Sequence, residues 1–185
     1  MYCNKCGEKL SNDAGLCKAC GSSMEDPSGT ELVQGEQENL DLAYAYVRKN
    51  QDYYFLKWKK ENSWNWAAFF LAPFWLGYRK MYRYLFMLFG AYLVTDILLL
   101  LIYPNYPESW DYSIGTAGYA VIGIKGNDLY KQKTYQMAER IKQQGGSLKD
   151  QLYRLEKAGG TTGWGILLAF LVLIGYALLL EFMYM

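Results

Sequence analysis

Apolar and polar residues are segregated along this chain of 185 residues, and their pattern divides it into three parts. Residues 1–21 hold four cysteines, residues 22–38 are polar and acidic, and residues 39–185 become progressively more apolar. Such segregation is typical of membrane proteins. The pattern predicts a small N-terminal module, a flexible acidic linker without a sustained apolar period, and an α-helical membrane domain.

The membrane domain begins with a predicted amphipathic helix at residues 39–61. Arginines and lysines alternate there with apolar residues at helical spacing, namely Leu40, Tyr44, Val47, Tyr54, Phe55 and Trp58. A basic amphipathic helix can lie on an anionic leaflet, or it can pack on the cytoplasmic face of its own membrane domain. The pattern fits both placements equally.

Three apolar runs are predicted to cross the membrane, at residues 84–103, 110–124 and 164–184. The first is 20 residues long and nearly all apolar. The second is shorter, and its small residues would let neighbouring helices approach closely. After it comes a predicted cytoplasmic basic loop at residues 125–160, whose first part is expected to continue the helix as far as Gly145 and Gly146.

An aromatic segment at residues 64–78 precedes the first crossing and is interrupted by Pro73. As a helix it would be about 22 Å long, which is short of the roughly 30 Å hydrocarbon core. This length favours a re-entrant or interfacial element.

The positions of the basic residues predict the topology. All 19 Lys and Arg residues lie before Tyr84 or between Lys125 and Lys157. Three crossings therefore place every one of them on the same side, which the positive-inside rule assigns to the cytoplasm. The N-terminus would then be cytoplasmic. If residues 64–78 also crossed, Arg79, Lys80 and Arg83 would be exported, so this four-span arrangement is the less favoured alternative.

The four cysteines form two Cys-x-x-Cys-Gly units, and their ligand set is Cys3, Cys6, Cys17 and Cys20. Four thiolates at this spacing are typical of a structural zinc site, which we expect to supply most of the folding free energy of so small a segment. A dithiol redox pair would need a βαβ context that the sequence lacks, and an iron site is the other alternative. A zinc ion with four protein ligands leaves no open position for catalysis.

Enzymatic activity is not expected from this composition. The chain has no histidine, and it shows no glycine-rich phosphate loop, nucleophile elbow or paired carboxylates within its spans. Asp96 is the exceptional residue, since it lies near the middle of the best span. It either has a function in transport or, as we favour, joins its helix to Ser113, Thr116 or Tyr112 on the next one.

Four motifs carry a resemblance to a known family: "YVRKNQDYYFLKW", "SWNWAAFFLAPFWLGYRKMY", "GNDLY" and "KAGGTTGW". With these motifs the chain resembles the domain-of-unknown-function 2628 family of small bacterial membrane proteins, across most of residues 44–164. The opening residues resemble a zinc-ribbon module found at the N-termini of membrane proteins in Gram-positive bacteria. The resemblance implies an architecture and a location without implying an activity.

Together these features predict a multi-pass protein of the bacterial cell membrane with a cytoplasmic zinc ribbon. We expect an adaptor or sensor that recruits a cytosolic or membrane protein partner; a small transporter or channel component that uses Asp96 is the alternative. The lipid bilayer is the other expected partner, and a homo-oligomer is compatible with the sequence. Nucleic acid is not expected, because the lysines of the ribbon are offset by Glu8 and Asp13.

Overall fold

The computed structural model describes residues 27–103, 106–107 and 109–184, and this part of the chain is helical without a β-strand. The chain divides into two units, residues 1–41 and residues 42–185. The predicted helical class of the second unit is confirmed. The predicted zinc ribbon at residues 1–21 lies outside the described residues.

Helix α1 spans Pro27–Val47, so the prediction of a flexible linker is wrong for residues 27–38. Residues 22–26 of that linker lie outside the described residues. The segment lacks an apolar period, but it is rich in Glu and Gln, which have high intrinsic helix propensity. Within the first unit, Gln37 Nε2 donates a hydrogen bond to Asp41 Oδ1 at 3.1 Å, a pairing that adds support at i,i+4 spacing.

The amphipathic helix predicted at residues 39–61 is wrong in its continuity. Helix α1 ends at Val47, and a separate helix α2 spans Gln51–Lys57. Between them, Arg48 and Asn50 adopt left-handed backbone conformations, with φ of 57° and 60°. Residues that follow the helix bind carbonyls of its last turn. Gln51 Nε2 donates to Tyr44 O at 2.8 Å and Gly160 N donates to Tyr46 O at 2.7 Å.

The aromatic segment at residues 64–78 forms two short helices, α3 at Trp66–Phe70 and α4 at Ala72–Tyr78. Asn65 caps α3, because its side-chain oxygen accepts a hydrogen bond from Ala68 N at 3.0 Å. Pro73 lies in the first turn of α4, where its missing N–H breaks no helical hydrogen bond. The segment therefore does not form one helix of spanning length.

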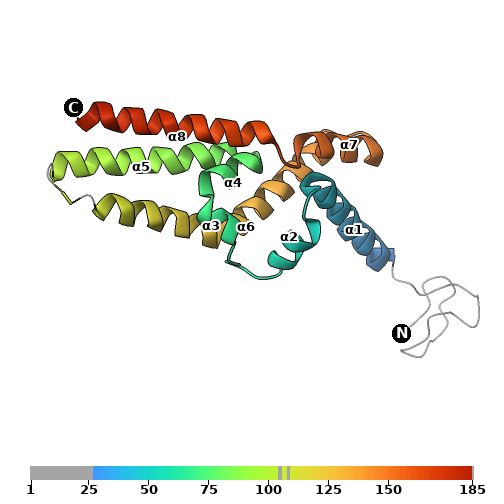
Figure 1. The fold of residues 1–185 in the computed structure, drawn as a ribbon. Coiled ribbons are helices and arrows are strands. Elements are labelled where there is room, and N and C mark those ends of the chain that lie inside the picture. Colours follow the sequence, from blue (N-terminus) through green and yellow to red (C-terminus); the bar gives the residue numbers. More distant parts are fainter. Residues whose placement is uncertain (1–26, 104–105, 108, 185) are drawn as a thin grey trace, which may run out of the picture. The chain divides into compact units, whose positions relative to one another are not determined.

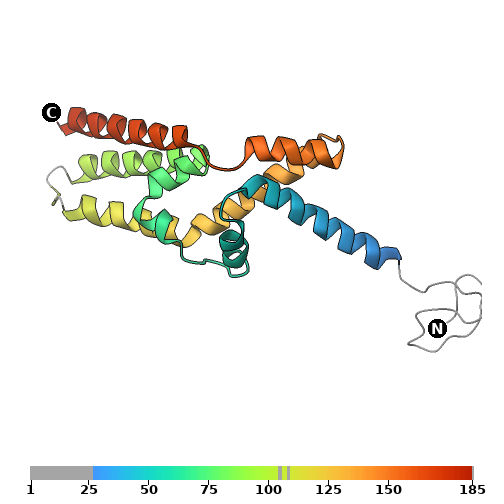
Figure 2. The ribbon, with the colours of Figure 1, turned by 45° about the vertical axis from the view of Figure 1, so that its right-hand side comes forward.

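Three longer helices lie side by side: α5 (Tyr82–Ile102), the first half of α6 (Ser109–Gln143) and α8 (Gly163–Tyr184) (Figures 1 and 2). Two of the described helices, α5 and α8, are long and apolar enough to cross a membrane. Their bounds agree closely with the predicted runs at residues 84–103 and 164–184.

Helix α6 is continuous over 35 residues, which corresponds to about 52 Å. This confirms that the helix of the second predicted crossing continues as far as the paired glycines. The description of residues 125–160 as a loop is wrong, because they comprise the end of α6 and a further helix, α7, at Leu148–Ala158. These residues have few large aliphatic side chains, but many of them are good helix formers.

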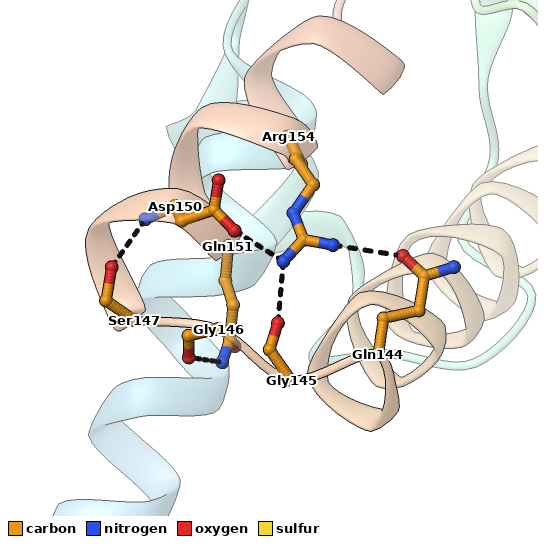
Figure 3. A network of polar contacts seen from close by, with 7 residues as sticks. All are labelled: Gln144, Gly145, Gly146, Ser147, Asp150, Gln151 and Arg154. Atoms are coloured by element: carbon orange, nitrogen blue, oxygen red, sulfur yellow. Dashed lines mark hydrogen bonds and ion pairs between the residues drawn. The ribbon is translucent and has the colours of Figure 1, made fainter.

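The turn between α6 and α7 uses the two glycines and a hydrogen-bonded network (Figure 3). Gly145 and Gly146 have φ of 73° and 106°, values that side chains disfavour. Ser147 caps α7 by accepting a hydrogen bond from Asp150 N at 3.3 Å. Arg154 then binds Gly145 O at 2.6 Å and pairs with Asp150, so the turn is fixed by side chains of the helix that follows it.

The closest approach between helices joins α4 to α8, at Gly77 and Gly165. A Cβ atom at Gly77 would lie 2.1 Å from the carbonyl oxygen of Gly165, and one at Gly165 would lie 1.9 Å from that of Gly77. The two backbones are therefore in direct contact, which only glycine permits. Thr162 N also donates to Tyr78 O at 3.0 Å, so the start of α8 is joined to the end of α4.

We expect Gly77→Ala to destabilise the protein by about 1–3 kcal/mol, because α4 and α8 would have to separate to accommodate the methyl group. Gly175→Ala in α8 is the matched control, since a Cβ there meets no atom within 4 Å. The measurement is thermal unfolding of the two purified variants in mild detergent. Equal melting temperatures for both variants would contradict this packing.

Candidate functional site

The predicted metal ligands Cys3, Cys6, Cys17 and Cys20 lie outside the described residues. Within the part that the structure describes, no group of three or more His, Cys, Asp or Glu side chains could hold a metal ion. Zinc binding at the four cysteines therefore stays a prediction.

Asp96 is buried on α5, with 6% of its surface exposed. Its Oδ2 accepts a hydrogen bond from the hydroxyl of Tyr176 on α8. The predicted kind of contact, a link between helices, is therefore present, but the predicted partners on the next helix are wrong. The hydroxyls of Ser113 and Thr116 instead bind carbonyls of their own helix, Ser109 O at 2.9 Å and Tyr112 O at 2.8 Å.

Sequence reasoning missed Tyr176 as the partner of Asp96, although a signal was available. Apart from the indole N–H of Trp164 at its start, Tyr176 carries the sole polar side-chain group in the apolar run at residues 164–180. A hydroxyl in such a run needs a partner when it is buried, as does a carboxylate. Which of the two neighbouring helices supplies that partner depends on how the helices pack, and the sequence pattern does not specify this.

A cavity of about 600 Å³ lies against Asp96, among α3, α5, α6 and α8. Its walls are mainly apolar and aromatic, and its polar lining includes Asp96, Asp111, Thr116 and four tyrosines. The structure thus brings two carboxylates from different helices to one cavity, although the sequence of no single span contains a pair of carboxylates. A concave, mostly apolar site with a few convergent polar groups is typical of small-molecule binding.

The α5–α6 contact beside this cavity depends on one tyrosine and one glycine. The Tyr92 hydroxyl donates a hydrogen bond to Gly115 O at 3.0 Å. A Cβ at Gly118 would lie 2.1 Å from the Tyr92 hydroxyl oxygen, so glycine is required where the ring crosses α6. The small residues predicted to allow close helix approach include this position, and at Gly118 that expectation is confirmed.

A second polar cluster surrounds Arg79, which is 2% exposed. Its guanidinium carbon lies 4.3 Å from the ring centre of Tyr54 and 5.1 Å from that of Tyr130. Its Nη atoms donate to Val47 O at 3.4 Å, to Lys49 O at 3.1 Å and to the Tyr130 hydroxyl at 3.3 Å. In the described part of the chain, no Asp or Glu is among its partners. Carbonyl oxygens and ring faces therefore stabilise this buried charge.

The motifs that carried the family resemblance meet around this cluster. Asn65 of "SWNW" and Asn127 of "GNDLY" are both buried, and Asn65 Nδ2 donates to Asn127 Oδ1 at 2.8 Å. Asn127 Nδ2 in turn donates to Ser63 O at 2.9 Å, and Asn65 N donates to Gly123 O at 2.8 Å. The aromatic segment is thereby fixed to the middle of α6.

Two half-buried lysines, Lys80 and Lys133, extend the cluster toward α7. Lys80 Nζ donates to Gly159 O at 2.5 Å and to two further carbonyls at the end of α7, where the helix dipole favours a cation. Lys133 Nζ donates to Lys80 O at 2.5 Å. Burial, together with the nearby charge of Lys80, lowers the pKa of Lys133 to about 8. Burial also raises the pKa of Tyr130 to about 12 and raises that of Tyr46.

The low pKa of Lys133 predicts that stability rises between pH 8 and pH 9.5. An unfolded chain keeps lysine protonated to about pH 10, so it binds more protons than the folded protein in this window, and the free energy of unfolding increases by at most about 1.4 kcal/mol per pH unit. Above about pH 10 the buried tyrosines act in the opposite direction, because the unfolded state then loses its tyrosine protons first.

Unfolding in mild detergent at several pH values checks this prediction. Lys133→Met should remove most of the pH dependence, whereas Lys149→Met, at an exposed position on α7, should retain it. An unchanged slope in Lys133→Met would show that other groups cause it.

Comparison with known proteins gives a family match that covers most of the cluster just described. No curated protein and no solved structure matches the chain. Residues 31–136 match the family described as "Protein of unknown function (DUF2628)". This range holds α2 to α5, most of α6 and both asparagines of the buried pair. The chain therefore belongs to the DUF2628 family.

Proposed function

We propose that this protein is a multi-pass protein of the bacterial cell membrane that acts as an adaptor or sensor, with a cytoplasmic zinc ribbon that recruits a protein partner. One observation carries the proposal: α5 and α8 expose large apolar side chains along their length, while every Lys and Arg of the chain except Arg83, in the first turn of α5, lies elsewhere. Exposed apolar surface of this extent marks an interaction with a membrane or a partner.

The two apolar helices bury few of their residues, which favours a membrane placement over the core of a soluble protein. In the most apolar stretch of α5, 22% of the residues are buried. In the most apolar stretch of Leu148–Met183, the range that contains α8, 6% are buried. Leu101 on α5 and Phe182 on α8 are 75% and 77% exposed. The core helix of a soluble protein would bury most of such residues. In water these faces would be costly, whereas hydrocarbon solvates them.

The first half of α6 supplies the third crossing in this proposal. It lies beside α5, on the side away from α8, and α6 is long enough to cross the hydrocarbon core and continue beyond it (Figure 1). Helices α3 and α4 have five and seven residues, too few for a crossing. This supports three spans over four, and it leaves Arg79, Lys80 and Arg83 in the cytoplasm with the remaining basic residues.

The zinc ribbon is the proposed recruiting element. Cys3, Cys6, Cys17 and Cys20 would hold one zinc ion with no open coordination position, which suits a structural role. The proposal therefore includes no enzymatic activity and no nucleic-acid binding. Its expected partners are the lipid bilayer and a cytosolic or membrane protein.

A small transporter or channel component is the second candidate function. The observation that favours it is the cavity of about 600 Å³ against Asp96. A carboxylate within a span is costly, so its presence beside an open volume points to a solute or to water. A sensor that binds a small molecule in its membrane domain would use the same cavity.

The proposed topology predicts the labelling of single cysteines in a variant that lacks the native four. A cysteine at Ser109 should react with an impermeant maleimide on intact cells, because it would lie outside. Cysteines at Ser22 and Ser147 should react only after lysis. Labelling at Ser147 without lysis would overturn the three-span arrangement.

The adaptor proposal predicts that zinc loading and partner capture fail together. Purified protein should carry about one zinc per chain, and Cys3→Ser or Cys20→Ser should remove most of it while the membrane domain stays folded. Crosslinking in cells at equal expression should then recover no partner with these variants. Ser11→Ala, within the same module, is the matched control and should behave as wild type. Capture that persists without zinc would exclude the ribbon as the recruiting element.

A further inference from the structure

The cavity among α3, α5, α6 and α8 has a negative lining. Asp96 and Asp111 both line it, and none of the described residues around it is a lysine or arginine. Asp96 is buried, whereas Asp111 lies near the start of α6 and is exposed. A buried carboxylate without a cation nearby is costly in an apolar surrounding, so this cavity favours a positively charged occupant.

Asp96 retains capacity to bind that occupant. Its Oδ2 accepts the hydrogen bond from Tyr176, but no described side chain donates to its Oδ1. Asp96 also lines the cavity, so its carboxylate lies within reach of an occupant. The Tyr176 bond orients the carboxylate without neutralising its charge.

The aromatic walls suit an organic cation. Phe89, Tyr92 and Tyr176 contact one another, with ring centres 5.4 to 6.4 Å apart, and Tyr112 and Tyr119 add two further phenol rings from α6. Ring faces attract cations, and desolvated sites strengthen this attraction. The volume of about 600 Å³ lies within the usual range for drug-sized ligands.

An inorganic cation fits this lining less well. A divalent metal takes several oxygen ligands at once. The described residues offer no group of three acidic or other metal-binding side chains, here or elsewhere. Two carboxylates on different helices, surrounded by rings, instead match a large cation of diffuse charge.

We propose that this cavity binds a hydrophobic organic cation, with Asp96 as its counter-charge and the tyrosine rings as its walls. Asp111, at the exposed end of the cavity, attracts the cation on entry. The proposed site rests on the membrane placement of α5, α6 and α8 under the proposed function. In a sensor the cation would be the signal, and in a transporter it would be the cargo.

Binding of tetraphenylphosphonium to the full-length protein in mild detergent tests the site, with titration calorimetry as the readout. Tetraphenylborate, an anion of the same shape, is measured separately as the charge control, and protein-free micelles give the background. We expect saturable 1:1 binding of tetraphenylphosphonium, at least 10-fold tighter than any binding of tetraphenylborate. Equal affinity for the two ions would overturn the proposal in favour of a neutral occupant such as a lipid chain.

Two variants remove the negative charges of the cavity one at a time. Asp96→Asn keeps the size of the side chain and can still accept the Tyr176 hydrogen bond, so it should fold, yet its affinity for tetraphenylphosphonium should fall at least 10-fold. Asp111→Asn, at the exposed end, should weaken binding only about 2- to 5-fold, because solvent screens an exposed charge. Wild-type affinity in a folded Asp96→Asn protein would exclude Asp96 as the counter-charge.

A third variant reduces the volume of the cavity and leaves both carboxylates in place. Gly115 lines the cavity, and a Cβ there meets no atom within 4 Å, so the side chain of Gly115→Leu should project into the cavity and obstruct a bulky cation without disturbing the helix contacts. Binding should be lost. Gly175→Leu on α8 is the matched control, since that position is also open but does not line the cavity, and it should bind as wild type.

Retained binding in Gly115→Leu would show that the cation partitions elsewhere and would overturn the site. The labelling and zinc experiments are independent of this result. Failure of the cation site therefore leaves the adaptor proposal standing, and failure of partner capture leaves the cation site standing.

Discussion

The hydrogen bonds of the buried Arg79 guanidinium are the interactions on which the arrangement of the second unit depends. A charge in this position needs many acceptors, and none of its described partners is a carboxylate. It obtains them from the backbone at the end of α1, where Val47 O and Lys49 O are exposed by the break before α2. The backbone at the helix end supplies carbonyl acceptors, and the Nη atoms of the arginine supply donors to them.

Other elements are positioned by the same cluster. The rings of Tyr54 on α2 and Tyr130 on α6 lie against Arg79, and Trp75 Nε1 of α4 donates to the Tyr54 hydroxyl at 3.3 Å. Lys80, the next residue, binds the carbonyl end of α7. Four helices are thus joined to the α4–α5 turn through two adjacent side chains. This gives a physical reason for the aromatic and basic character of the family's motifs, which periodicity by itself does not explain.

The second unit has two regions of different character, the cluster around Arg79 and the apolar helices around Asp96. Around Arg79, several hydrogen bonds and ring contacts fix the positions of the helices, although Arg79 Nε and Trp58 Nε1 are buried there without a hydrogen-bond partner. Around Asp96 the packing is looser, and a cavity of about 600 Å³ stays open beside a carboxylate that has one hydrogen-bond donor. Helix α6 continues from the cavity to the cluster around Arg79, so the proposed cation site and the proposed cytoplasmic part would be joined by one helix, as the proposed sensor requires. The membrane domain would then bind a solute, and the zinc ribbon would bind the partner.

The amino-acid sequence by itself determined the helical class, the two most apolar helices and the extension of α6 as far as Gly145, because length, hydropathy and helix-ending glycines are local properties. It also singled out Asp96.

The tertiary structure decided where α1 ends, since the break at Arg48 is stabilised by Arg79 and Gly160 from distant parts of the chain. It likewise decided that Tyr176 is the partner of Asp96, and that Asp111 shares the cavity with it. These contacts depend on the rotation of each helix about its axis. In helices that are apolar on nearly every face, periodicity does not specify that rotation, and packing contacts such as Gly77 against Gly165 and Tyr92 against Gly118 determine it instead.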